Sequence, residues 1–318
     1  MKNFDFTIPE SLDSKRLDVA IAALCPDLSR SKIQKLIAQS LVSLNGQVVA
    51  SKRTTVNTDD SISFQAAEEK PLAAIPQSMP LDIAYEDSSL MVINKPSGLV
   101  VHPGAGNPDQ TLLNAIIAKC PDNTHLPQAG LIHRLDKDTT GLLIIAKNEA
   151  SYFKLNQAMA KRHIKRTYLA LVKGKIHKGG TIDAAIARHS KFRQKYCVHP
   201  TGRNAVTHYQ VEERFPHHTL LRISLETGRT HQIRVHMLHL NHPIVGDTLY
   251  HRGQHIKQST LSEKAKATLY AFKRQALHAV ELTFDHPEQE KQVNVKSTIP
   301  SDFDHLLKAL RTSAEDPA

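Results

Sequence analysis

One aspartate stands between an arginine and a lysine in a segment that could carry chemistry. In HRLDKDTTG, residues 133–141, Asp136 has an arginine two positions before it and a lysine directly after it. Apolar runs on both sides predict two strands, so the loop between them is held against the edge of a sheet. Loops supported in this way often carry function. An aspartate in a turn more commonly accepts a local hydrogen bond or caps a helix, so a structural role stays open.

Groups that could act on this carboxylate lie about one hundred residues further on. ETGRTHQIRVHMLHLNHPIVGD, residues 226–247, begins as a strand end, turns at Gly228 and continues as a predicted helix. It carries Arg229, His231, Arg234 and His236. An arginine near Asp136 would favour the ionised carboxylate, which suits a nucleophile or a base and not a general acid.

A tyrosine offers a second kind of group. Tyr168 lies in KRTYLALV, whose alternation predicts a strand. A phenol can present its ring to a nucleobase and its hydroxyl to a proton. Filling a hydrophobic core is the other common role of such a residue.

The charge of the chain points to a polyanion. Its 318 residues carry a formal charge of +10, and 40% of them are hydrophobic, as in ordinary globular proteins. Residues 161–234 hold 16 Lys and Arg against 4 Asp and Glu, so the excess is concentrated there. Nucleic acid or a membrane surface would bind such a region. A merely solvated basic face is the alternative.

Several classes of protein fit poorly. Cys25, Cys120 and Cys197 form no C-x-x-C pair, which disfavours disulfide frameworks and thiolate zinc sites and fits a reducing cytoplasm. The N-terminal segment lacks the apolar core of a secretion signal, and no run reaches the ~18 apolar residues of a membrane span. No phosphate-binding or dinucleotide motif occurs, so no nucleotide cofactor is implied.

A metal enzyme is a rival interpretation. Nineteen histidines are present, and the cluster His231, His236, His239 and His242 has spacings seen in some zinc sites. The cluster lacks an H-E-x-x-H motif, and three of its spacings do not share one helical face. We therefore expect no metal.

The first part of the chain reads as a small unit. A helix with Leu17 and Ile21 is followed by a second helix starting at Ser29, in which Ile33, Leu36 and Ile37 form one apolar stripe. LVSLNGQVV then predicts a hairpin with Asn45-Gly46 at its turn.

A proline-containing segment separates this unit from a larger one. We predict domains at 1–66 and 81–310, a linker at 67–80 and a loose tail at 311–318. From Leu81 onward, many closely connected strands alternate irregularly with helices. This order predicts an α+β domain with a mixed, mostly antiparallel sheet.

The first unit resembles the S4 RNA-binding domain in KRLDVAIAAL, LSRSKIQKLI and VSLNGQVV. The resemblance implies an RNA surface that no spacing alone could reveal. Its residues are Arg16, Ser29, Arg30, Lys32, Lys35, Asn45 and Lys52. A small packing module with surface lysines is the alternative.

The larger unit resembles the RluA-type RNA pseudouridine synthases. HRLDKDTTG, KRTYLALVKG and TGRTHQIRVH match the three active-site motifs of that family in order, and the likeness extends from about residue 10 to 305. The resemblance implies the pseudouridine synthase fold and a cofactor-free isomerisation of specific uridines in large-subunit (23S) ribosomal RNA. It leaves open which S4-containing member of the family this chain is.

The resemblance also implies roles for single residues. Asp136 would be the catalytic aspartate, paired with Arg234, and Tyr168 would stack on the target uracil. Arg134 would enter the RNA in place of the extruded base, and Arg229 would bind RNA. Whether the aspartate attacks the nucleoside or removes the C2′ proton stays open. We expect a monomer that acts on a stem-loop of free RNA or of an assembling ribosomal particle; a non-catalytic RNA-binding protein is the second rival.

Overall fold

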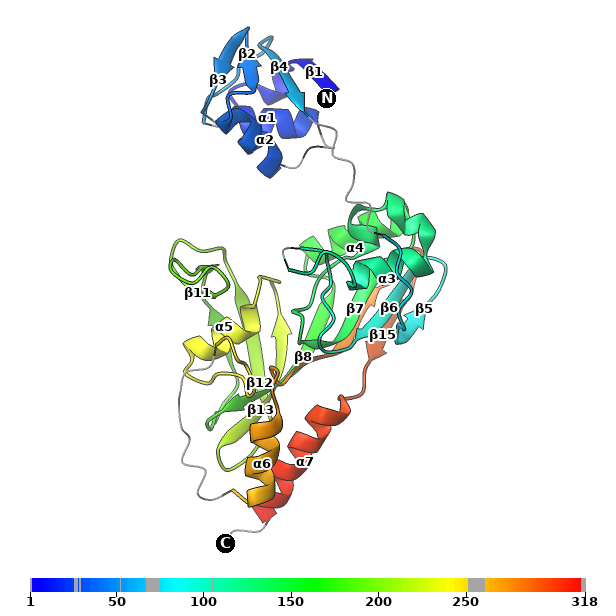
Figure 1. Cartoon of the computed structure of the whole chain (residues 1–318), viewed down its shortest axis with the longest axis vertical. Helices are drawn as coiled ribbons and strands as arrows, with labels where there is room; N and C mark the ends of the chain where they lie inside the picture. Colours follow the sequence, from blue (N-terminus) through cyan, green and yellow to red (C-terminus); the bar gives the residue numbers. More distant parts are fainter. Residues whose placement is uncertain are drawn as a thin grey trace. The chain divides into compact units, whose positions relative to one another are not determined.

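A computed structural model describes residues 2–25, 28, 30–51, 53–66, 75–104, 106–250 and 261–315. The chain divides into two compact units, residues 1–73 and 74–318 (Figure 1). Each unit has its own core, so each is described by itself.

The first unit packs two helices on a four-stranded sheet. Its elements are β1 (Lys2–Thr7), the 3₁₀ turn η1 (Glu10–Leu12), α1 (Leu17–Leu24), α2 (Arg30–Ala38), β2 (Val42–Leu44), β3 (Gln47–Val49) and β4 (Ser61–Ala66). The strands are antiparallel in the order β1-β4-β2-β3. Strand β1 was not predicted, because the sequence analysis assigned elements only from the helix that contains Leu17 onward.

The local predictions for this unit are confirmed. Ile33, Leu36 and Ile37 of α2 are buried, as the apolar stripe requires. Asn45 and Gly46 both have positive φ, 50° and 76°, and join β2 to β3 in the tight turn that an Asn-Gly pair favours.

The second unit is built on one large sheet. Its strands are β5 (Ile83–Glu86), β6 (Leu90–Lys95), β7 (Thr140–Ala146), β8 (Lys165–Lys173), β9 (Gly180–Asp183), β10 (Ile186–Arg188), β11 (Tyr196–Val198), β12 (Val206–Arg214), β13 (His218–Leu225), β14 (Leu277–Asp285) and β15 (Gln292–Lys296). Its helices are α3 (Leu112–Lys119), η2 (Pro121–His125), η3 (Pro127–Gly130), α4 (Glu149–Ala160), α5 (Gln232–His239), α6 (Glu263–Ala271) and α7 (Ser301–Glu315).

The large sheet confirms the predicted fold class. Among the described residues its strands run in the order β5-β6-β7-β14-β8-β13-β12-β9, with β15 beside β14. Within it only the pairing of β7 with β14 is parallel. Strands β10 and β11 form a separate hairpin. The domain is therefore α+β with a mixed, mostly antiparallel sheet.

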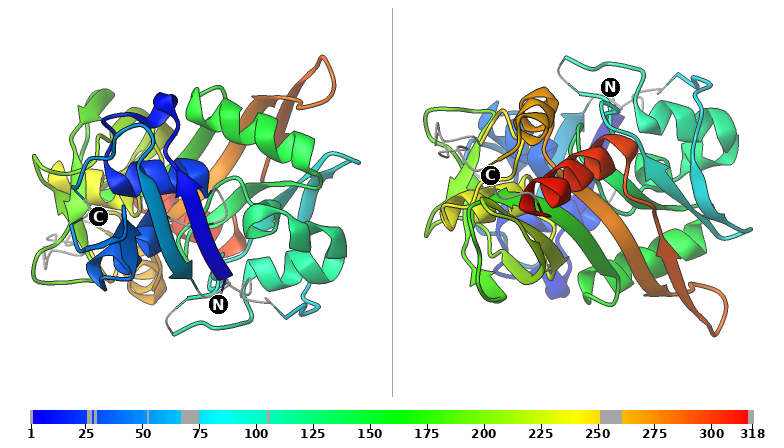
Figure 2. Two further views of the ribbon diagram at one scale, coloured as in Figure 1. Left: turned by 90° about the horizontal axis from the view of Figure 1, so that it is seen from above. Right: turned by 90° about the horizontal axis from the view of Figure 1, so that it is seen from below.

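Helices cover both faces of the half of the sheet that contains β6 and β7. Leu143 and Ile145 of β7 belong to the same apolar cluster as Ile116 of α3. Leu142 and Ile144 cluster instead with residues that include Leu155 of α4. Alternate residues of a strand point to opposite faces, so the wholly buried β7 separates two layers of helix (Figure 2).

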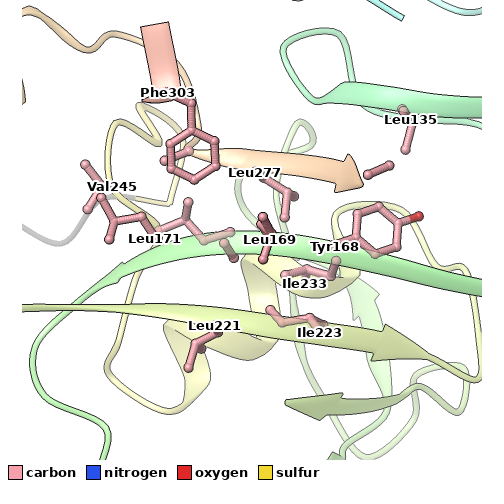
Figure 3. Packing of buried hydrophobic residues seen from close by; sticks show 14 of the residues in the cluster. Leu135, Tyr168, Leu169, Leu171, Leu221, Ile223, Ile233, Val245, Leu277 and Phe303 are labelled. Atoms are coloured by element: carbon pink, nitrogen blue, oxygen red, sulfur yellow. The ribbon is translucent and has the colours of Figure 1, made fainter. Parts of the chain in front are cut away.

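The middle of the sheet forms the largest core. Leu171 of β8, Leu221 of β13, Leu277 of β14 and Phe303 of α7 belong to this core, and Tyr168 stands at one end of the residues that Figure 3 draws. The ring of Tyr168 is thereby fixed by the packing of the sheet.

The C-terminal helix corrects one prediction. Helix α7 runs to Glu315, five residues into the predicted loose tail. Leu310 and Ser313 are buried, and the Ser313 hydroxyl accepts a hydrogen bond from the Ser262 amide at 2.7 Å. Packing against α6 therefore orders residues 311–315.

The described part of the predicted linker also has fixed partners. The Asn114 side chain donates to the Ile75 carbonyl at 3.0 Å, and the Gln77 amide donates to the Asn114 carbonyl at 3.1 Å. Ile75 and Gln77 therefore lie against α3 in the second unit.

Candidate active site

A hydrogen-bonded turn holds Asp136 just before the start of β7. The Thr139 amide donates to the Asp136 carbonyl at 3.0 Å and closes the turn. The Lys95 ammonium group, at the end of β6, donates to the carbonyls of Lys137, Pro96 and Leu99 at 2.7–2.9 Å. Burial lowers the pKa of Lys95 to about 7, although the carboxylates of Asp138 and Asp136 act to raise it. The Lys95 ammonium group thus fixes the backbone next to Asp136.

Arg234 joins Asp136 to a second acid. Its Nη1 lies 2.9 Å from Oδ2 of Asp136, while its Nε and Nη2 bind both oxygens of Asp247 at 2.7 and 3.0 Å. Burial acts to lower the pKa of Arg234, but hydrogen bonds and charge from Asp247 and then Asp136 outweigh it and raise this pKa. The guanidinium therefore stays charged, and it fixes the position of the Asp136 carboxylate.

His231 faces the same carboxylate from the N-terminal end of α5. Its Nε2 lies 3.9 Å from Oδ1 of Asp136, and its Nδ1 is 2.7 Å from the Tyr250 hydroxyl. That hydroxyl also accepts a hydrogen bond from the Tyr196 amide. Burial lowers the pKa of His231. The ring is therefore neutral at neutral pH, and Arg234 remains the charged partner of Asp136.

Tyr168 completes the group from β8. The residue is buried, and burial raises the pKa of its phenol, so the phenol stays protonated at neutral pH. Within the described part of the chain we find no hydrogen-bond partner for its hydroxyl. The phenol and the carboxylate line one pocket, in which the hydroxyl can meet a ligand.

The pocket is large enough for a nucleoside. Its volume is about 420 Å³, and it is formed by the Asp136 turn, the end of α4, the start of β8 and the loop from β13 into α5. Arg134 and Arg229 also line it. Arg134 is exposed, whereas Nε of Arg229 donates to the Asn204 carbonyl at 3.0 Å. The structure thus brings together all the residues predicted for the active site.

Comparison with known proteins decides the family. A family model described as RNA pseudouridylate synthase matches residues 89–239, which include Asp136, Tyr168 and Arg234. The ribosomal large subunit pseudouridine synthase D of Yersinia pestis is 46% identical over 310 residues, 98% of this chain and 95% of that protein. The chain belongs to the RNA pseudouridine synthase family.

Further members of the RNA pseudouridine synthase family agree with this assignment. The synthase D of Haemophilus ducreyi is 47% identical over 93% of this chain and 91% of its own length. The solved structure of human RNA pseudouridylate synthase domain containing 4 has a TM-score of 0.57 and 27% identity, and covers 72% of this chain and 93% of that one. An S4 domain model matches residues 15–62.

The predicted RNA-binding residues of the S4 domain lie in different settings. Arg16 makes two hydrogen bonds to the buried carboxylate of Asp18, at 3.0 and 3.1 Å, and its side chain is 43% exposed. Lys35 is exposed on α2. The exposed Asn45 binds Asp60 and Ser61 through its side chain. It therefore stabilises its own turn.

Four predicted residues of the S4 domain cannot be placed in full. Ser29 and Lys52 lie outside the described residues. Arg30 and Lys32 belong to the first turn of α2, but their side chains are outside the described part.

Sequence reasoning missed other residues of the site in this synthase. Asp247 and Tyr250 lie in HPIVGDTLY, residues 242–250, to which the sequence analysis gave no role. Arg166 lines the pocket two residues before Tyr168. The period of two along a strand was a signal for it, because residues 166 and 168 of one strand share a face.

Histidines of the cluster that was considered as a metal site make hydrogen bonds to other groups of the protein. His236 bonds to Thr207 and to the Ala184 carbonyl, and His242 bonds to the Lys173 carbonyl. Over the ranges that the structure covers, no three His, Cys, Asp or Glu side chains are grouped as a metal ion would need. Nor does any helix of those ranges combine the length and apolarity needed to cross a bilayer.

Proposed function

We propose that this enzyme converts specific uridines of large-subunit ribosomal RNA into pseudouridine, with Asp136 as the catalytic group and without a cofactor. The reaction breaks the bond between N1 of uracil and C1′ of the ribose, turns the base, and joins its C5 to C1′. C5 releases its proton to solvent and N1 takes up a proton, so substrate and product have the same composition. The names of the relatives, which cover nearly the whole chain, support the choice of RNA.

One observation carries the proposal: the carboxylate of Asp136 stands in an open pocket, 2.9 Å from a buried guanidinium and beside a buried phenol. An ionised carboxylate is what either route of the reaction needs, as a nucleophile at the nucleoside or as a base at C2′. Tyr168 is suited to stack on the uracil and to assist proton removal from C5.

The substrate nucleotide must leave the RNA stack before it can enter the pocket. Extruding a base costs a few kcal/mol. Arg134, exposed two residues before Asp136, can offset part of this cost by stacking and by pairing with phosphate. We assign further RNA contacts to Arg229 and to the S4 residues Arg16, Ser29, Arg30, Lys32, Lys35, Asn45 and Lys52.

We further propose that the enzyme acts in the cytoplasm as a monomer, on a stem-loop of free RNA or of an assembling particle.

The test is the substitution Asp136→Asn, which removes the charge and keeps the shape. We expect this variant to bind large-subunit RNA with nearly the parent affinity and to release no tritium from RNA labelled at C5 of uridine. Small-subunit RNA with the same label serves as the control substrate, and the parent should release little tritium from it. Equal release by variant and parent from large-subunit RNA would refute the catalytic role.

A further inference from the structure

Arg166 carries a positive charge into the wall of the active-site pocket. It lies on β8, two residues before Tyr168, so both side chains leave the same face of the strand. The residue is only 7% exposed, yet it lines the pocket with Asp136 and Tyr168.

The guanidinium of Arg166 has no protein partner in the described residues. Its Nε is buried without a hydrogen bond, and no ion pair joins it to an acid. The two carboxylates that line the pocket are held by other groups. Asp136 pairs with Arg234, and Glu226 pairs with Arg162 and His208.

Two neighbours of Arg166, Gly228 and His133, lie near the guanidinium and carry no negative charge. A Cβ atom at Gly228 would lie 2.8 Å from Nη1 of Arg166, so the glycine lets the loop after β13 come close to the guanidinium. The nearby His133 ring is buried, and burial together with the charge of Arg166 lowers its pKa to about 3. His133 is therefore neutral and adds no second positive charge beside Arg166.

A buried charge without a partner is unfavourable unless a ligand of opposite charge binds to it. The neutral carbonyls of uracil cannot balance a full positive charge, whereas a phosphate can, and its oxygens fit the planar fork of a guanidinium. We propose that Arg166 binds one phosphodiester group adjacent to the target uridine and thereby positions the extruded nucleotide over Asp136. This inference rests on the proposed RNA substrate.

The experiment pairs a protein variant with single-phosphate changes in the RNA. A hairpin substrate is prepared as a set in which each phosphate near the target uridine is replaced, one at a time, by an uncharged methylphosphonate. Affinity and single-turnover kcat/KM are measured for the parent and for Arg166→Gln. We expect the parent to lose about 10- to 100-fold at one position, and Arg166→Gln to show a similar loss with the natural RNA.

The decisive quantity is the coupling of the two changes. At the phosphate that Arg166 binds, the modification should cost Arg166→Gln almost nothing, because the contact is already absent. Thermal unfolding first checks that the variant is folded. If the effects of the Arg166 substitution and of the methylphosphonate are then fully additive at every phosphate position, the inference is overturned. If Arg166→Gln does not fold, Arg166→Lys is used. Relative to the parent, Arg166→Lys should lose less affinity and kcat/KM on methylphosphonate replacement, and only at the phosphate that Arg166 binds.

A matched variant separates this contact from general charge. Arg162→Gln removes another arginine of the pocket, one that is 57% exposed and paired with Glu226. It should keep the parent's sensitivity at the phosphate in question; loss of that sensitivity also overturns the inference. Failure of the proposed function would appear separately, as no conversion of natural RNA by the parent, while the affinity measurements would still test Arg166.

Discussion

At the scale of single residues, the arrangement around Asp136 depends on one guanidinium shared by two acids. Arg234 makes two hydrogen bonds to Asp247, whose side chain is completely buried, and one to the partly exposed Asp136. The buried acid orients the arginine, and the arginine in turn orients the acid in the pocket. Asp247 is thus a positioning residue that does not itself face the substrate pocket.

This arrangement predicts a large effect of Asp247→Ala. The substitution leaves the buried Arg234 with Asp136 as its remaining acid and removes the acceptor of the Leu249 and Tyr250 amides. Removing one partner of a buried ion pair costs about 3–5 kcal/mol. We expect a loss of that order in the free energy of unfolding, measured by denaturant titration, together with reduced turnover.

An exposed ion pair provides the control for that variant. Glu212 and Arg222 make a bidentate pair on neighbouring strands, with side chains 37% and 38% exposed. Glu212→Ala should cost no more than about 1 kcal/mol. Similar losses in the two variants would show that Arg234 does not depend on Asp247.

At the scale of elements, strand β14 connects the turn of Asp136 to the central core and contains a buried histidine. His278 bonds to the Thr140 hydroxyl at 2.9 Å, where β14 and β7 run parallel. Burial, with a contribution from the charge of Arg274, lowers the pKa of His278 to about 4. The folded protein therefore keeps this ring neutral at pH values where the unfolded chain binds a proton.

The consequence is a loss of stability in acid. Between about pH 6.5 and pH 4 the unfolded state takes up the proton first, so the free energy of unfolding falls as the pH falls. His278 contributes up to about 1.4 kcal/mol per pH unit in this range and nothing above it. His278→Asn should flatten the pH dependence measured by denaturant unfolding. The exposed His305 is the control, because His305→Asn should leave the slope unchanged.

At the scale of the whole molecule, the S4 domain and the candidate active site belong to different units. The pocket lies wholly in the second unit, and the first unit has a core of its own. Removing residues 1–70 should therefore weaken binding to large-subunit RNA more than it slows turnover on a saturating hairpin. Affinity falls with salt in proportion to the phosphates contacted, so the truncated protein should also show a shallower salt dependence.

The parent and truncated proteins are compared by titration at several salt concentrations and by single-turnover assay, after thermal unfolding shows that both are folded. Unchanged affinity and salt dependence would mean that the S4 domain does not hold the substrate.

The sequence by itself determined what short-range patterns encode. Periodicity identified the α2 stripe, strand β7 after Asp136 and strand β8 with Tyr168, and the Asn-Gly pair identified the β2–β3 turn. The strand predicted before Asp136 is wrong, because residues 131–135 make only an isolated bridge from Leu131 to Ile145. Three motifs were enough to indicate the family and five of the residues that line the pocket, Arg134, Asp136, Tyr168, Arg229 and Arg234. Each of these signals acts over a few residues, so no knowledge of strand order is needed to detect it.

The tertiary structure alone decided which of these groups meet. Asp136 and Arg234 are 98 positions apart, and their contact depends on the order of the strands in the sheet and on the packing of α5. The same packing buries Asp247 behind Arg234, leaves Arg166 without a counter-charge among the described residues, and orders residues 311–315. Such features arise from burial and from distances between remote segments, which local sequence patterns do not encode.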